Sequence, residues 1–353
     1  MRRFIYSLIT AQGANRLFYV LFRPLLLASS FIYVNIVRLI RFFYRINLLK
    51  SKKPKSKVIS VGNITWGGTG KSSLVALISR FLDAKNKRPA ILIRGYGEDE
   101  DRMLKEQLNT TVLSGRDRIK NAKKAEDKYN ADVLILDDGF QHWRIKRDLD
   151  IVSINATDPF GNGNIIPAGI LREPISALKR ADIIILTKVN LADEKDIAGI
   201  KNIIQGVASD VEIFEAEYKP FFLTETSKNE ERSLDYIANK KLCAVAAIGD
   251  NNSFFRMLSD LSPEITYKFS FPDHHKYTQS NIKDIVSAAK KTNSDAIITT
   301  SKDWIRLKPC FNKNVCDIEI LLLNIAIKIK NEGSFFDSIA RYIHLPMLSK
   351  KGF

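Results

Sequence analysis

The chain contains little cysteine and little histidine for its length. Its 353 residues include three cysteines and four histidines. Cys243, Cys310 and Cys316 match neither a metal-binding spacing nor a disulfide framework. Cys243 and Cys316 lie in apolar runs, where a free cysteine ordinarily serves as a small buried side chain. These absences exclude a disulfide-stapled secreted scaffold and a cysteine-rich zinc module, and they favour a protein of the reducing, cytoplasmic side.

Acidic residues are absent from the first 57 residues, which hold twelve lysines and arginines. The remainder carries 43 basic and 39 acidic residues, so most of the net charge of +16 belongs to the N-terminus. The composition is otherwise that of a globular protein, with 45% hydrophobic residues. A chain of this length is sufficient for two domains, each with its own core.

The basic N-terminus is also strongly apolar between residues 17 and 44. Its longest stretch without charge, residues 24–37, is 14 residues long, whereas a spanning helix needs about 20. Arginines and aromatic residues among the apolar ones, next to the lysines of 50–57, favour a helix lying in an anionic membrane interface. A short true span and a core helix are the alternatives. Basic residues alone would also suit nucleic acid, but the apolar residues between them favour lipid, and no nucleic-acid partner is expected.

Apolar strand candidates alternate with helical segments along the rest of the chain. Several strands are continuous apolar runs, as in a parallel sheet covered on both faces. The alternation predicts a doubly wound α/β fold, with a domain boundary near the polar stretch 224–232. The predicted strands are 58–62, 90–94, 133–136, 151–154, 183–187, 211–218, 242–248, 265–271, 296–300 and 317–323. The predicted helices are 70–84, 116–129, 193–205, 252–261 and 279–292.

Residues 57–74 are the most informative stretch of the chain. An apolar run leads into a glycine-rich turn, and Gly70-Lys71-Ser72 then opens a segment with apolar residues at helical spacing. A strand, a glycine-rich loop and a helix in this order can point backbone N–H groups at phosphate oxygens. The lysine would reach the β- and γ-phosphates, and the serine hydroxyl would hold Mg²⁺. Thr65 stands where the strict pattern has glycine, and a turn without a ligand is the alternative interpretation. The sequence predicts a nucleotide-phosphate site.

Two adjacent carboxylates, Asp137 and Asp138, follow the predicted strand 133–136. The carboxyl end of a parallel strand lies beside the phosphate loop in folds of this class. Two carboxylates at that place suit Mg²⁺, bound directly or through water. A helix cap together with a solvated acid is the structural alternative.

A second polar group, Asp273-His274-His275, follows the predicted strand 265–271 and a proline. A turn with these residues at a strand end is suited to acid–base or electrostatic work. Because neighbouring side chains point in different directions, we expect only one of the two histidines to reach a reacting centre.

Two further loops follow predicted strands on the same side of the first sheet. Arg94-Gly95-Tyr96-Gly97 is followed by four acids, Glu98-Asp99-Glu100-Asp101. Such a run is usually a solvated loop, but its position raises the alternative of a base near an acceptor hydroxyl. The loop 160–174 is rich in glycine and proline and too long for a simple connection, which is typical of functional loops.

Together, these segments carry a resemblance to a known family. The sequence closely resembles the tetraacyldisaccharide 4′-kinases, the lipid A 4′-kinases, from the N-terminal apolar segment to about residue 308. The segments that carry the resemblance are residues 62–71, 94–97, 137–142, 160–174, 271–275 and 300–303. The family's phosphate loop has the same shifted glycine arrangement, which accounts for Thr65.

The resemblance implies transfer of the ATP γ-phosphate to the 4′-hydroxyl of a tetraacylated glucosamine disaccharide 1-phosphate, with ATP and Mg²⁺ as cofactors. It implies two doubly wound α/β domains joined by a short β linker, the first P-loop NTPase-like, and an N-terminal membrane-associated helix. We therefore expect a membrane-interface segment over 1–47, a nucleotide-binding domain over 48–222 and a second domain over 223–353. A peripheral or monotopic protein on the cytoplasmic face of the inner membrane is expected, without an obligate protein partner.

Site residues follow from the same resemblance, motif by motif. Asp99 would act with His274 to activate the sugar hydroxyl, Asp101 competes with Asp99 for that role, and Arg172 is a candidate for the acceptor's 1-phosphate. Lys71 would act in catalysis as well as in binding. The residues expected to bind the nucleotide are Thr65, Gly67, Gly68, Thr69, Gly70, Lys71, Ser72 and Ser73. The residues expected around the metal are Ser72, Asp137, Asp138 and Glu173.

The main alternative from another class is a membrane-associated nucleotide switch, a GTPase or ATPase without a lipid substrate. Thr187-Lys188-Val189-Asn190 is similar to the guanine-reading pattern Asn-Lys-x-Asp, but both of its end residues differ. A switch would hydrolyse nucleotide slowly, respond to a protein partner and form no phosphorylated lipid.

Overall fold

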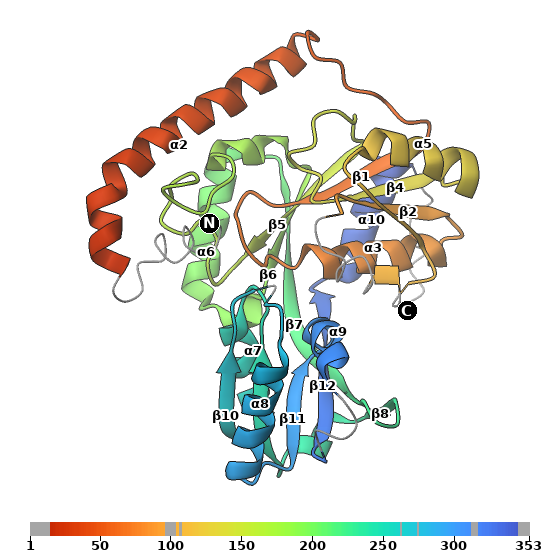
Figure 1. Ribbon diagram of the computed structural model, residues 1–353. Helices are drawn as coiled ribbons and strands as arrows, with labels where there is room; N and C mark the ends of the chain where they lie inside the picture. The colour runs from red at the N-terminus through yellow and green to blue at the C-terminus, as the bar shows by residue number, and fades with distance from the viewer. Residues whose placement is uncertain are drawn as a thin grey trace. The chain divides into compact units, whose positions relative to one another are not determined.

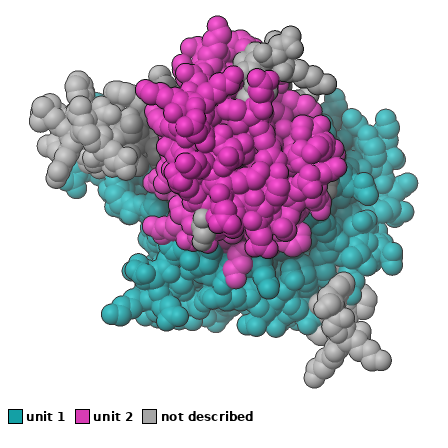
Figure 2. Space-filling view, turned by 90° about the horizontal axis from the view of Figure 1, so that it is seen from below, with its two compact units in different colours: residues 1–96, 104–217, 328–353 teal, residues 97–103, 218–327 magenta. Residues whose placement is uncertain are grey.

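The computed structural model describes residues 15–95, 104–105, 108–261, 263–273, 275–311 and 317–344. The fold is mixed α/β, and its strands pair mostly in parallel (Figure 1). The chain divides into two compact units (Figure 2). Unit 1 comprises the described residues of 1–96, 104–217 and 328–353, and unit 2 comprises those of 218–327.

Unit 1 is built on a parallel sheet in which β1 lies between β4 and β5. The order is β7-β6-β5-β1-β4-β2-β3. Strands β2 to β4 therefore lie on one side of β1, and β5 to β7 lie on the other. The carboxyl ends beside β1 therefore form the switch point at which open α/β sheets bind ligands. The strands are β1 (Lys57–Gly62), β2 (Pro89–Ile93), β3 (Thr111–Ser114), β4 (Val133–Asp137), β5 (Leu149–Asn155), β6 (Ile183–Thr187) and the first part of β7 (Glu212–Glu225).

Helices cover both faces of this sheet. In Figure 1, α3 and α5 lie on opposite faces of β1, β4 and β2. The cluster under α5 joins Ala122 and Ala125 to Val58, Leu134 and Leu136, while α6 packs on β5 and β6. The described helices of unit 1 are α2 (Asn15–Arg45), α3 (Lys71–Ala84), α5 (Arg118–Tyr129), η1 (Ile175–Arg180), η2 (Val189–Leu191), α6 (Glu194–Val207) and α10 (Glu332–Ile343).

Unit 2 has a smaller sheet with its own core. Its order is β10-β9-β11-β12-β7, with β8 paired to β7 in the antiparallel sense. The strands are β8 (Glu230–Arg232), β9 (Lys241–Ala246), β10 (Glu264–Ser270), β11 (Ala296–Thr300) and β12 (Glu319–Ile329). The helices are η3 (Leu234–Ile237), α7 (Asn251–Ser259), α8 (Gln279–Lys291), α9 (Ser301–Leu307) and η4 (Lys308–Cys310). Cys243 is fully buried in β9, as predicted, and burial raises the pKa of its thiol to about 12.

Every strand and helix predicted from the sequence in these units is present within a few residues of its expected limits, except that β7 continues to Glu225 and β12 to Ile329. The described elements that were missed include the four-residue β3, the three-residue β8, the short α9, the C-terminal α10 and the 3₁₀ helices. The domain limits 48–222 and 223–353 stay a prediction. By compactness, the described residues after 327 belong to unit 1.

The N-terminal apolar segment forms one long helix, α2, with Pro24 inside it. Residues 22–45 form a stretch that is long and apolar enough to cross a membrane. Ser30 and Val34 are buried. Among the side chains described for α2, from residue 22 onward, nine large apolar ones are instead exposed: Phe22, Leu25, Leu27, Phe31, Ile32, Ile36, Leu39, Ile40 and Phe42.

Candidate active site

The loop between β1 and α3 is held from two sides. Asn63 is fully buried, and its Nδ2 donates to Thr69 Oγ1 at 3.0 Å. The carbonyl of Thr69 accepts hydrogen bonds from the hydroxyls of Ser153 and Thr187, which lie on β5 and β6. Because these donors belong to the neighbouring strands, the loop is fixed at the carboxyl ends of the sheet.

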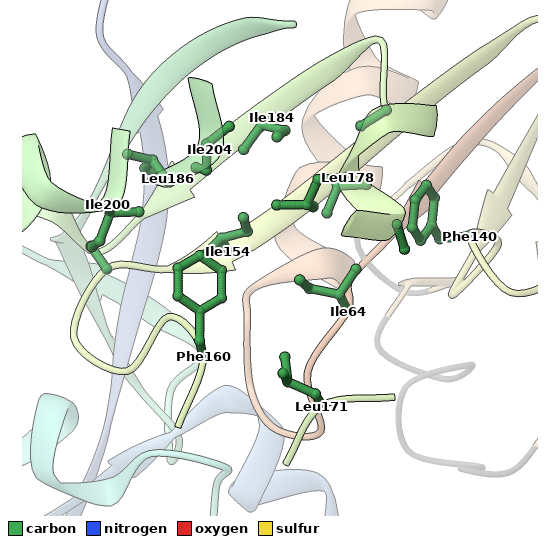
Figure 3. Close-up of a cluster of buried hydrophobic side chains, with 14 of the residues drawn as sticks. Ile64, Phe140, Ile154, Phe160, Leu171, Leu178, Ile184, Leu186, Ile200 and Ile204 are labelled. Carbon is green, nitrogen blue, oxygen red and sulfur yellow. The ribbon is translucent and has the colours of Figure 1, made fainter. Parts of the chain in front are cut away.

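The first half of the loop is extended, which explains why it accepts a threonine. Thr65 is 3% exposed and pairs with Leu171 as an isolated antiparallel bridge. The backbone of 64–66 exchanges hydrogen bonds with that of 170–172. Ile64 and Leu171 also belong to one buried cluster with Phe140 (Figure 3). The loop 160–174 therefore pairs with the glycine-rich loop through its backbone and packs against it.

The second half of the loop turns sharply into the helix. Gly67 and Gly70 have φ of 146° and 80°, a region that side chains other than glycine rarely adopt. Gly70 is the N-cap of α3, and no side chain caps the helix. Lys71, Ser72 and Ser73 form the first turn. A helix N-terminus of this kind, at the switch point, suits an anionic ligand such as phosphate.

Asp138 lies just beyond β4 between two cations. Its Oδ1 is 2.7 Å from Arg172 Nη1 and 3.7 Å from Lys71 Nζ. Burial opposes the charge on this carboxyl, but Lys71 and Arg172 outweigh burial and lower the pKa of Asp138. Asp138 is thus held ionised beside the lysine of the loop, 30% of its side chain remaining exposed.

The turn that carries Asp137 and Asp138 is fixed by its backbone. Arg118, from the first turn of α5, is 2% exposed and donates to the carbonyls of both aspartates. A Cβ on Gly139 would lie 2.7 Å from Ser60 Oγ, so only glycine lets the turn pack onto β1. The carboxylate of Asp137 is buried, at 4% exposure.

Glu173 is buried in a group of planar side chains. Both of its carboxylate oxygens accept hydrogen bonds from the Arg180 guanidinium, each at 3.0 Å. The same guanidinium lies over the rings of Phe140 and Trp143, 4.2 and 4.4 Å from their centroids. Gln141 Nε2 donates to the Asn63 carbonyl at 2.8 Å and to Glu173 at 3.2 Å, so it links Glu173 to the glycine-rich loop.

The side chains predicted to hold a metal ion suit Mg²⁺ better than a transition metal. Ser72, Asp137, Asp138 and Glu173 offer only oxygen ligands, which Mg²⁺ prefers. No three acidic, histidine or cysteine side chains gather as a metal cage in the part of the chain that the structure describes. A Mg²⁺ ion here would therefore complete its coordination with phosphate oxygens and water, as this ion commonly does.

The turn after β10 in unit 2 is partly described. His275 stacks on Phe271 with ring centroids 4.5 Å apart, meets Tyr277 edge-on, and its Nε2 is 3.0 Å from Asn281 Oδ1. His275 is therefore engaged in packing and in the start of α8. His274, Asp99 and Asp101 lie outside the described residues.

Sequence reasoning missed the residues that hold the acidic ones in place. Arg118, Gln141 and Arg180 were not singled out, and each contacts a predicted site residue or its backbone. Gln141 lies inside the motif 137–142, so its position could have suggested a role in the site. Arg118 and Arg180 belong to segments without a distinctive pattern.

Comparison with known proteins identifies one family. The profile described as tetraacyldisaccharide-1-P 4′-kinase matches residues 22–344. The chain belongs to the tetraacyldisaccharide 4′-kinase family. The tetraacyldisaccharide 4′-kinase of Halothermothrix orenii is 34% identical over 337 residues, covering 86% of this chain and 88% of the relative. That of Syntrophus aciditrophicus is 34% identical over 333 residues, covering 83% and 86%.

A solved structure agrees with the family. LpxK from Aquifex aeolicus, crystallised in complex with ATP, matches with a TM-score of 0.70 at 28% identity. The match covers 91% of this chain and 99% of the LpxK chain. The mostly parallel α/β fold is thus that of a tetraacyldisaccharide 4′-kinase.

Proposed function

We propose that this chain transfers the γ-phosphate of ATP to the 4′-hydroxyl of tetraacyldisaccharide 1-phosphate, a lipid A precursor. It is an ATP- and Mg²⁺-dependent lipid kinase, as its family membership indicates. The observation that carries the proposal for the site is the position of Asp138, just beyond β4, between Arg172 and Lys71, the residue that opens α3 after the glycine-rich loop. In phosphoryl transfer the protein mainly positions the reactants and neutralises charge.

The nucleotide phosphates bind in the loop before α3. The segment is a P-loop in this proposal, with contacts from Thr65, Gly67, Gly68, Thr69, Gly70, Lys71, Ser72 and Ser73. Lys71 neutralises charge on the transferring phosphoryl group. Mg²⁺, which shields the phosphate oxygens when bound, is held by Ser72, Asp137, Asp138 and Glu173. The first unit is then the nucleotide-binding domain, doubly wound and P-loop NTPase-like, and the second is a separate α/β domain reached by a short β linker.

The sugar hydroxyl is activated by Asp99 with His274, and Asp101 remains the competitor of Asp99. The neighbouring His275 is already engaged with Phe271 and Asn281, which argues against His275 for this role. Arg172 already pairs with Asp138, which favours a role beside the nucleotide over a role at the acceptor's 1-phosphate.

The exposed apolar side chains of α2 bind the membrane that contains the acceptor lipid. Nine large apolar residues between Phe22 and Phe42 are exposed on this helix, and burying each in lipid is favourable. Arginines within the same stretch favour a helix lying in the interface, on the anionic cytoplasmic face of the inner membrane, over a helix that spans it.

The test is transfer of radiolabelled phosphate from ATP to tetraacyldisaccharide 1-phosphate in detergent with Mg²⁺. We expect a bisphosphorylated lipid whose new phosphate, located by fragmentation mass spectrometry, is on the 4′-position. His274→Ala should lower kcat by about 10²–10⁴-fold, while His275→Phe, which keeps the stacking on Phe271, should lower kcat far less.

Nucleotide hydrolysis without a lipid product would contradict the proposal and favour the nucleotide switch. Equal losses of kcat in the two histidine variants would contradict the assignment of His274.

A further inference from the structure

Helix α2 contacts the same chain segment that carries Glu173. Ser30 is 7% exposed, and its hydroxyl donates to the Ile165 carbonyl at 2.7 Å and accepts from the Ala168 N–H at 3.0 Å. These bonds join the middle of α2 to the loop 160–174.

Arg41 extends this contact to Glu173 itself. Its Nη1 is 3.8 Å from Glu173 Oε2, and its guanidinium lies over the Trp143 ring, 5.2 Å from the centroid. Tyr44, three residues further along α2, stacks on the same Trp143 at 6.3 Å. Polar and planar contacts thus hold the helix against the rest of unit 1, while nine of its large apolar side chains between Phe22 and Phe42 are exposed.

The carboxylate of Glu173 is therefore shared between two arginines. Oε2 faces both Arg180 and Arg41, whereas Oε1 accepts from Arg180 and Gln141. Two guanidinium groups at one carboxylate repel each other, so Arg41 and Arg180 compete for Glu173 Oε2. If α2 moves away, Arg180 alone holds Oε2 and the carboxylate is free to shift toward it. The position of α2 thus affects the position of the buried Glu173 carboxylate.

We propose that α2 positions Glu173 for phosphoryl transfer, with Arg41 as the positioning residue, so that docking of this lipid-facing helix supports catalysis as well as lipid capture. The inference rests on the proposed function, since it takes Glu173 to lie at the Mg²⁺ site. Removal of a residue that orients a metal-binding side chain typically costs about 10–100-fold in metal affinity or activity. Loss of Arg41 should therefore change kcat and the Mg²⁺ requirement rather than the KM for lipid alone.

Arg38 provides a matched control on the same helix. It is exposed and carries the same charge one turn away from Arg41. Replacement of either arginine by alanine removes one positive charge from α2. If both act only through the anionic surface, both variants should behave alike. If Arg41 positions Glu173, only Arg41→Ala should alter the Mg²⁺ dependence.

The experiment compares the full-length chain with Arg41→Ala, Arg41→Lys and Arg38→Ala in the labelled-phosphate assay, with Mg²⁺ varied at saturating ATP and lipid. Arg41→Ala should lower kcat about tenfold and raise the Mg²⁺ concentration for half-maximal rate about tenfold. Arg38→Ala should keep both and change at most the KM for lipid. Arg41→Lys should recover part of the loss, because lysine keeps the charge but lacks the planar group that stacks on Trp143.

Binding to anionic vesicles, measured by sedimentation, should fall equally in Arg41→Ala and Arg38→Ala, which separates surface attraction from positioning. If Arg41→Ala does not fold, Arg41→Lys carries the test, and an unchanged Mg²⁺ requirement in it overturns the inference. The same Mg²⁺ dependence in Arg41→Ala and Arg38→Ala overturns it as well. A wild-type chain that forms no phosphorylated lipid contradicts the proposed function, and the inference fails with it.

Discussion

Asp138 in unit 1 and Asp303 in unit 2 occupy comparable places, each just beyond the carboxyl end of a buried parallel strand. Asp138 has two cations beside it and 30% of its side chain exposed. Asp303 is fully buried and accepts hydrogen bonds from the Ala247 N–H and the Thr300 hydroxyl. The pKa of Asp138 is lowered, because Lys71 and Arg172 outweigh burial, whereas burial raises the pKa of Asp303.

The difference shows that a carboxylate at a strand end does not by itself mark a site. The Asp303 carboxylate connects α9 to the residue that follows β9 and to the end of β11, because it accepts hydrogen bonds from the Ala247 N–H and the Thr300 hydroxyl. Asp138 is paired with Lys71 and Arg172, and a bound phosphate or metal ion can compete for these ion pairs. Asp303 also has a cation beside it, since Arg306 Nη1 lies 3.8 Å from its Oδ1. The two carboxylates therefore differ in burial and in the hydrogen bonds that hold Asp303, from the Ala247 N–H and the Thr300 hydroxyl, and not in the mere presence of a cation.

The largest effect expected on stability tests whether cations hold the buried acid of unit 1. Arg180→Met removes the fork that pairs with both oxygens of Glu173, whose side chain is 1% exposed. Removal of one partner of a buried pair costs about 3–5 kcal/mol. Urea unfolding should show a loss of that size, whereas Lys179→Met, at the exposed neighbouring position, should change little. A loss below about 1 kcal/mol would mean that Glu173 does not depend on Arg180.

A smaller effect concerns pH. Burial and the charges of Arg118, Arg144, Arg147 and Arg94 lower the pKa of His142 to about 4. An unfolded histidine has a pKa of about 6.5, so the folded state binds fewer protons between these values. The free energy of unfolding should therefore fall as the pH drops from about 6.5 to 4, and the loss that His142 causes should be complete below pH 4.

The check is thermal unfolding across that range in the wild type and in His142→Gln. The fall in Tm between pH 7 and pH 4 should be smaller in the variant by about 5–10 °C. His344→Asn, at an exposed histidine, should follow the wild type. A His142→Gln curve parallel to the wild type would show that His142 is not the group that takes up the proton.

Local signals predicted the framework of the site. The continuous apolar run of 133–136 identified β4, and Gly70-Lys71-Ser72 identified the start of α3. Both signals are local, because strand burial and the N-terminal turn of a helix depend on adjacent residues. The placement of Asp137 and Asp138 at the carboxyl end of a strand next to β1 followed from the same reasoning and is confirmed.

The partners of these residues could not be predicted from the sequence, because they come from distant segments of the chain. Arg172 meets Asp138 across 34 residues, and Arg41 meets Glu173 from another element altogether. No periodicity or spacing encodes such pairs. The short β3 and α9 were missed for another reason, since four and seven residues give too few repeats for a pattern to be recognised. The roles of Asp99 and His274 stay predictions.

The most direct measurement is labelled-phosphate transfer to tetraacyldisaccharide 1-phosphate by Asp138→Asn and Asp303→Asn, with the Tm of each variant recorded. Asp138→Asn should lower kcat by about 10²–10³-fold and leave the Tm close to that of the wild type. Asp303→Asn should lower the Tm, because a buried carboxylate with fitted donors is replaced, and should keep kcat within about tenfold of the wild type. Full activity in Asp138→Asn, or a greater loss of kcat in Asp303→Asn, would contradict the account of this site.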